Sequence, residues 1–87
     1  MSVVTIRYFA AAKAAVGRVG DELDAAGRSI ADVLGEIAAG ATGTSSSEAG
    51  AVLSRCSFLL NRSATTDRTR VLADGDTLDV LPPFAGG

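Results

Sequence analysis

Apolar and polar residues alternate near the start of the chain, as they do in a strand that buries one face. The apolar positions are Val4, Ile6 and Tyr8. Continued by one residue, the alternation places Phe9 on the opposite face, together with Thr5 and Arg7. The pattern predicts a first strand that carries an aromatic side chain, Phe9, on its outer face.

A second alternating segment covers residues 77–81 and follows a turn at residues 73–76, where Gly75 stands in the position that turns favour. Its inward positions are Leu78 and Val80. Asp79 and Leu81 fall on the other face. We therefore predict a last strand whose outer face ends in an apolar residue, Leu81.

The clearest helix lies in the middle of the chain. Its apolar positions, spaced at i, i+3, i+4 and i+7, are Ile30, Val33, Leu34 and Ile37. They form one stripe on a helix. Ser29 stands at the N-cap with Asp32 three residues on, in the capping-box pattern, and Gly40 ends the helix. The stripe must be buried, and the strands are the only elements available to cover it.

Shorter segments connect these elements. Residues 10–16 are rich in alanine and predict one or two helical turns, ended by Gly17. Residues 18–23 predict a weak second strand with Val19 and Leu23 in the core. Residues 40–50 are small and polar, which is typical of a mobile loop.

The segment after this loop predicts a second short helix at residues 47–55, followed by a strand at residues 57–60. That strand is apolar at Phe58, Leu59 and Leu60. Such a run indicates a strand covered on both faces, or one whose outer face meets a partner. Residues 61–63 predict a turn.

The order strand, strand, helix, strand, strand gives an α+β fold, with one main amphipathic helix on one face of a mixed sheet. The first and last strands are the expected central neighbours. This is the layout of a β-grasp domain. We expect residues 1–81 to form that single domain and residues 82–87 to form an extended tail.

Composition excludes several classes of function. The chain has 87 residues, 8 basic and 10 acidic side chains and no histidine. Its net charge of −2 argues against nucleic-acid binding, and the missing histidine excludes His-based catalysis and most zinc sites. No apolar run is long enough to span a membrane, and no signal peptide precedes the first strand, so a cytoplasmic protein is expected. The chain does not resemble a free-standing enzyme.

The end of the chain suggests a chemical role. Pro82 and Pro83 cannot continue a strand and favour a stiff, extended backbone. Gly86 and Gly87 carry no side-chain bulk and would let a terminal carboxylate enter a narrow channel. Adenylation by another enzyme would activate that carboxylate, and a sulfur donor would convert it to a thiocarboxylate. The alternative is a frayed tail without function.

Three segments together resemble the small, sulfur-carrying subunit of molybdopterin synthase. They are IRYFA at residues 6–10, LADGDTL at residues 72–78 and PPFAGG at residues 82–87. The resemblance implies a ubiquitin-like β-grasp fold. It also implies that Gly87 is adenylated and then thiocarboxylated, and that its sulfur helps build the dithiolene of molybdopterin. On this reading the chain binds no cofactor, and the activating enzyme uses ATP to adenylate Gly87.

The resemblance also implies partners and the residues that meet them. The partners are the large synthase subunit in a heterotetramer, an adenylyltransferase similar to ubiquitin-activating enzymes, and a sulfur donor. Phe9 and Leu81 match apolar docking positions, with Ala64 near a third. The residues expected to line the partner's entry channel are Pro82, Pro83, Phe84, Ala85 and Gly86. The small and polar residues 41–50 depart from the family pattern.

Other functions remain open at this point. Carriers for thiamine thiazole, cysteine or tRNA thiolation share the fold and the diglycine, as do ubiquitin-like modifiers, although Lys13 is the one lysine available for a chain of modifiers. A plain binding module is the third alternative. Cys56 is interpreted as a buried small residue, and Asp74 and Asp76 as turn residues without a metal.

Overall fold

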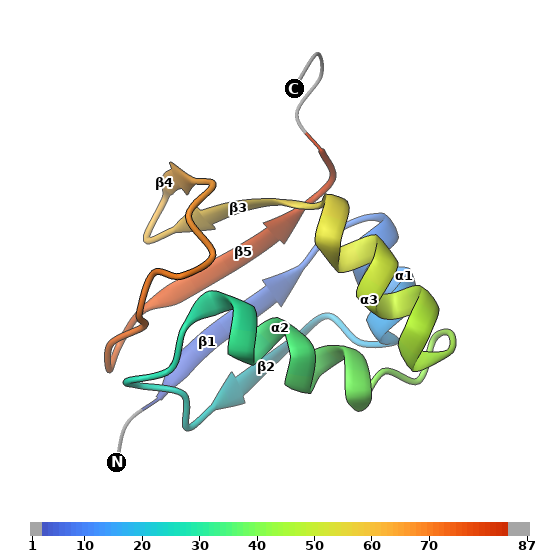
Figure 1. Ribbon diagram of the computed structural model, residues 1–87, viewed down its shortest axis with the longest axis horizontal. Helices are drawn as coiled ribbons and strands as arrows, with labels where there is room; N and C mark the ends of the chain where they lie inside the picture. Colours follow the sequence, from blue (N-terminus) through green and yellow to red (C-terminus); the bar gives the residue numbers. More distant parts are fainter. Residues whose placement is uncertain (1–2, 84–87) are drawn as a thin grey trace.

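A computed structural model describes residues 3–83 and shows a five-stranded mixed sheet with three helices on one of its faces (Figure 1). The strand order is β2-β1-β5-β3-β4. The elements in chain order are β1 Val4–Tyr8, α1 Ala11–Val16, β2 Gly20–Leu23, α2 Ile30–Ala39, α3 Ser46–Arg55, β3 Ser57–Leu60, β4 Ser63–Thr65 and β5 Thr77–Leu81. This arrangement confirms the predicted α+β β-grasp fold.

The first and last strands lie side by side at the centre of the sheet, as predicted. β1 and β5 run parallel with Ile6 opposite Leu78, and Tyr8 opposite Val80. β2 pairs with β1 and β3 pairs with β5, both antiparallel. The two ends of the sequence are therefore fixed to each other in the most protected part of the sheet.

The core lies between the sheet and the helices. Its large, fully buried side chains come from strands β1, β3 and β5 and from helices α2 and α3. They include Val4, Ile6, Tyr8, Ile30, Val33, Ile37, Leu53, Phe58, Leu78 and Val80. The α2 stripe is buried as predicted, and the Ser29 hydroxyl accepts a hydrogen bond from the Asp32 N–H at 3.1 Å. Gly17 ends α1 with φ 90°, and its N–H donates to the Lys13 carbonyl at 2.9 Å.

The polar segment after α2 is shorter than predicted and is packed. α3 already begins at Ser46, with the Ser45 hydroxyl accepting a hydrogen bond from Glu48 N–H. The Thr42 N–H donates to the Val16 carbonyl at 3.0 Å. A Cβ on Gly43 would lie 1.8 Å from the Ala14 carbonyl oxygen, so the segment touches α1 closely. Small residues here serve close packing, which a mobile loop would not require.

The predicted core position of Val19 was wrong. Val19 is 69% exposed and lies before β2, which begins at Gly20, so it contributes nothing to the core. The predicted turn is present at residues 61–62, but Ser63 already belongs to an additional edge strand, β4. No helix among residues 3–83 is long and apolar enough to cross a membrane.

Candidate functional site

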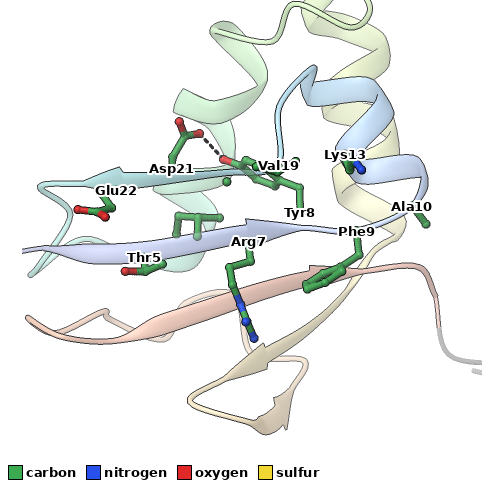
Figure 2. Close-up of a pocket in the computed structure, with 11 residues that line it drawn as sticks. Thr5, Arg7, Tyr8, Phe9, Ala10, Lys13, Val19, Asp21 and Glu22 are labelled. Atoms are coloured by element: carbon green, nitrogen blue, oxygen red, sulfur yellow. Dashed lines mark hydrogen bonds between the residues drawn. The ribbon is translucent and has the colours of Figure 1, made fainter.

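The face of the sheet opposite the helices is the candidate site, and we call it the outer face. The strand register sets its central row, in which Arg7 lies opposite Asp79 and Asp79 opposite Leu59. Leu59 in turn lies opposite Ala64 of β4. Figure 2 shows Thr5, Arg7 and Phe9 on one side of β1 and Tyr8 on the other, as the sequence alternation requires.

A bidentate ion pair occupies the middle of the outer face. Arg7 Nε donates to Asp79 Oδ1 at 2.6 Å, and Arg7 Nη2 donates to Asp79 Oδ2 at 2.7 Å. The Asp79 side chain is 8% exposed and the Arg7 side chain 52%. The hydrogen bonds and the charge of Asp79 raise the pKa of Arg7. The outward direction of Asp79 was predicted, but its burial beneath Arg7 was not.

Apolar side chains flank this pair toward the end of β5. Phe9 is 38% exposed, and the Arg7 guanidinium carbon lies 5.7 Å from the centroid of its ring. The Phe9 N–H donates to the Val80 carbonyl at 3.0 Å, which holds Phe9 beside β5. Leu81 is half-buried and lies opposite Ser57. Phe9 and Leu81 thus reach the predicted face, and their role in docking stays a prediction.

The chain leaves the sheet next to these apolar residues. β5 ends at Leu81, and Pro82 and Pro83 follow it with exposed side chains. The other predicted tail residues lie outside the described part of the chain: Phe84, Ala85, Gly86 and Gly87. The structure therefore places the beginning of the tail at the rim of the outer face.

A groove of about 800 Å³ runs along β1 and β2 from the outer face to the start of α1 (Figure 2). Phe9, Ala10 and Val19 give it apolar walls, while Arg7 and Lys13 contribute charge. The sequence placed Val19 in the core and so missed this groove. The signal that could have found it is Gly17, since a helix that ends at residue 17 leaves two residues to turn before β2.

At the groove, a partly buried polar network ties β2 to β1. Tyr8 Oη donates to Asp21 Oδ2 at 2.7 Å, and Arg18 Nε donates to Asp21 Oδ1 at 2.8 Å. Burial raises the pKa of Asp21, but the hydrogen bonds from Arg18 and Tyr8 outweigh it and leave that pKa below its usual value. Burial and the bond to Asp21 raise the pKa of Tyr8 far above its usual value. The network holds the wall of the groove in place.

The remaining chemical candidates have structural roles. The Cys56 thiol is buried and donates to the Val52 carbonyl at 3.3 Å. Burial raises its pKa against a smaller opposing effect of Arg68, so the thiol stays protonated and is a poor nucleophile.

Asp74 and Asp76 hold the turn before β5, as predicted. Asp74 Oδ1 accepts from the Val3 N–H at 2.7 Å, and Asp76 Oδ2 accepts from the Ala73 N–H at 2.8 Å. Among residues 3–83 there is no cluster of three or more side chains suited to bind a metal ion. The candidate site consists of the three features described above: the outer face, its groove and the point at which the tail leaves β5.

Comparison with known proteins agrees with this geometry. The ThiS family matches residues 6–87 of the chain. No protein of curated function matches it significantly.

Among solved structures, the chain is similar to a protein assigned as molybdopterin converting factor subunit 1 from Pyrococcus furiosus, with a TM-score of 0.76, 20% identity, and coverage of 95% of this chain and 99% of that one. It is also similar to small archaeal modifier protein 1 of Haloferax volcanii, with a TM-score of 0.72, 20% identity and the same coverage. Subunit 1 in a complex of subunits 1 and 2 of molybdopterin-converting factor from Helicobacter pylori matches with a TM-score of 0.61 and 22% identity, over 98% and 99% of the two chains. The chain belongs to the ThiS family of ubiquitin-like sulfur carriers, and the small modifiers share its fold.

Proposed function

We propose that the chain carries sulfur as a thiocarboxylate on Gly87 and donates it as the small subunit of molybdopterin synthase. The observation that carries this proposal is the position of the tail. β5 delivers Pro82 and Pro83 to the rim of an outer face on which Phe9 and Leu81 are accessible. One protein surface can then bind a partner while the tail beside it reaches the partner's active site.

The chemistry proceeds in three steps. The Gly87 carboxylate attacks the α-phosphate of ATP in the adenylating enzyme, and pyrophosphate leaves. A sulfur nucleophile at the oxidation level of sulfide attacks the acyl adenylate, AMP leaves, and the thiocarboxylate remains. In the synthase, the thiocarboxylate sulfur attacks the substrate carbon and displaces an oxygen leaving group from it. Water then hydrolyses the acyl–sulfur bond, which leaves the sulfur on the substrate and returns Gly87 to a carboxylate. The partner enzymes supply the catalytic groups, and this chain supplies positioning and effective concentration.

The choice of the molybdopterin pathway rests on the ending PPFAGG and on the relatives. The Helicobacter pylori relative is found in a complex of subunits 1 and 2 of molybdopterin-converting factor. We assign the corresponding large subunit as the partner of this chain, with an adenylating enzyme as the second partner on the same face. Phe9, Leu81 and the residues from Pro82 to Gly86 would make these contacts.

The intact mass of the chain, co-expressed with the adenylating enzyme and a sulfur donor, tests the carrier function. We expect a species heavier by the replacement of one oxygen by sulfur, located at Gly87 by fragmentation. Deletion of Gly87 should abolish this species and molybdopterin synthesis but leave the melting temperature unchanged. A deleted chain that still supports synthesis would contradict the proposal.

A protein modifier is the second candidate, because a small archaeal modifier shares the fold over nearly the whole chain. The products of the activated chain separate the two functions. A modifier would appear as isopeptide adducts between Gly87 and lysines of other proteins, whereas a synthase subunit would restore molybdopterin to an extract that lacks it. Adducts without molybdopterin synthesis would favour the modifier.

A further inference from the structure

The loop between β3 and β4 contains an arginine with an unfavourable backbone conformation. Asn61 has φ 50° and Arg62 has φ 70°, and Leu60 pairs with Ser63 across them. Two-residue hairpin loops with positive φ at both positions favour asparagine followed by glycine, because glycine adopts this backbone without a steric cost. Asn61 follows this preference and Arg62 departs from it. Strained residues of this kind are concentrated at functional positions.

Contacts inside the protein do not explain why Arg62 occupies this position. Asn61 anchors the loop to β5, since its Nδ2 donates to Asp76 Oδ1 and its Oδ1 accepts from the Thr77 N–H, both at 2.9 Å. The exposed Arg62 forms no hydrogen bond or ion pair with the other residues between 3 and 83. Its guanidinium is therefore available to a binding partner.

Arg62 lies at a cleft of about 410 Å³ on the outer face. The cleft is lined by Thr5, Arg7, Asn61, Arg62, Thr77 and Asp79. The Arg7–Asp79 pair forms part of its wall, and the cleft lies near the end of the sheet where β5 begins. Phe9 and Leu81 lie toward the other end of the same face. Arg7 connects the two regions, because it lines the cleft and its guanidinium carbon lies 5.7 Å from the centroid of the Phe9 ring.

The charges of the cleft favour a ligand with a single negative charge. Two arginines and one aspartate line the cleft, and both oxygens of Asp79 already accept hydrogen bonds from Arg7. An arginine has five N–H donors, so Arg7 keeps others for a ligand. The net charge of the lining is +1, on a chain whose total is −2. A carboxylate matches this charge, whereas a phosphate dianion would exceed it and be repelled by Asp79.

We propose that Arg62 and Arg7 together bind the carboxylate of an aspartate or glutamate side chain on the adenylating enzyme when it docks on the outer face. The identity of the partner rests on the proposed function, but the chemistry of the cleft does not. Contacts from this cleft fix the rotation of the partner about the apolar anchors at Phe9 and Leu81. Arg62 is in this sense a specificity-determining residue.

The cleft itself is tested by NMR titration of the isolated chain with N-acetylglutamate amide, N-acetylglutamine amide and inorganic phosphate. The acidic probe should shift the amide signals of Thr5, Arg62 and Thr77, and the neutral glutamine probe should not. Arg62→Gly should remove these shifts. The absence of shifts with the acidic probe would overturn the proposal, as would a larger response to phosphate.

Binding to the adenylating enzyme is the second test, measured by calorimetry. Arg62→Gly should raise the melting temperature, because glycine relieves the backbone strain, and still weaken binding by about fivefold. Arg62→Glu should weaken it by at least about tenfold, since it places a negative charge opposite the partner's carboxylate. Arg55→Gln, in α3 on the other side of the sheet, removes the same charge as a control and should leave the affinity unchanged.

The two tests separate the failure of this inference from the failure of the proposed function. If the wild-type chain does not bind the adenylating enzyme but the acidic probe shifts the cleft signals, the proposed function fails and the cleft stands. If the enzyme binds wild type and Arg62→Gly equally well, the inference fails, and the carrier function is unaffected.

Discussion

Asp21 shows how a single, partly buried carboxylate maintains the local structure near the candidate site. It accepts hydrogen bonds from Tyr8 of β1 and from Arg18, which precedes β2. Because β2 is an edge strand paired only with β1 among the described strands, this network restrains its position in addition to the strand pairing. The groove along β1 and β2 depends on that restraint.

Replacement of Asp21 by asparagine should lower the free energy of unfolding by about 1–2 kcal/mol at neutral pH, because a charged acceptor of two hydrogen bonds is lost. The lowered pKa of Asp21 sets the pH dependence. Its stabilising effect is complete above the unfolded-state pKa of about 4 and is lost as the pH falls through the lower, folded-state pKa. Urea unfolding of both proteins across this range measures the difference.

The difference between wild type and Asp21→Asn should therefore shrink at acidic pH. Glu22→Gln is a suitable control, because it removes the carboxylate of the adjacent residue, whose side chain is exposed. A difference that stayed constant down to the most acidic pH would show that the charge of Asp21 is not what stabilises the network.

At the scale of elements, the packed segment between α2 and α3 makes a sharp prediction. Gly43→Ala should destabilise the fold by about 1–3 kcal/mol, because the new methyl group would overlap the Ala14 carbonyl oxygen. Gly35→Ala is the matched control. No atom lies within 4 Å of a Cβ at that helical position, so this substitution should stabilise α2 by about 0.5–1 kcal/mol. Thermal unfolding of the two variants would give shifts of opposite sign.

Equal effects of the two substitutions would mean that residues 41–45 are not held against α1. The sequence does not predict this packing, since small polar residues occur both in loose loops and at close contacts. The contact that distinguishes the two cases here is made by the Ala14 carbonyl, which is far from Gly43 along the chain.

Elements with strong local patterns were predicted well, and those that depend on long-range pairing were not. The stripe and N-cap of α2 and the alternation of β1 and β5 follow from nearby residues. β4 has three residues, of which two are exposed, and it exists because β3 offers it an edge. A burial pattern therefore cannot reveal it.

In the candidate site too, features set by local patterns were predicted and those set by long-range pairing were not. Alternation correctly placed Phe9 and Leu81 on the outer face. It could not predict the burial of Asp79, because its partner Arg7 is brought opposite by parallel pairing of the two ends of the chain. Val19 was misplaced because β2 begins at Gly20, two residues later than predicted, which leaves Val19 outside the strand.

At the scale of the whole molecule, the proposed function assigns docking and sulfur transfer to separate parts of the chain. The outer face would provide affinity, and the tail would provide the reacting group. Variants of the two parts should therefore affect different kinetic quantities, which makes the division testable.

Phe9→Ala should weaken binding of the large synthase subunit by about 2 kcal/mol, or about 30-fold in Kd, because it removes an apolar anchor. Leu81→Glu should have at least this effect. The folding stability should change much less for Phe9→Ala, since that side chain is already 38% exposed. Calorimetry and thermal unfolding give the two quantities, with Val71→Ala, an exposed residue beside Ser29, as the control. An unchanged affinity, or loss of the fold, would contradict the assignment of the face.

Gly86→Val should have the complementary effect, with a slower reaction and nearly unchanged binding. A β-branched side chain next to the reactive carbonyl restricts the backbone and adds bulk in the partner's channel. The reacting atoms must approach to about 3–3.5 Å, and a displacement of about 1 Å can reduce the rate roughly a hundredfold. Single-turnover formation of the adenylate, and then of the sulfur-transfer product, measures this at saturating partner. Gly86→Ala should fall between wild type and the valine variant. Rates equal to wild type in both steps would show that Gly86 is incidental, and would remove the main chemical reason to assign sulfur transfer to the tail.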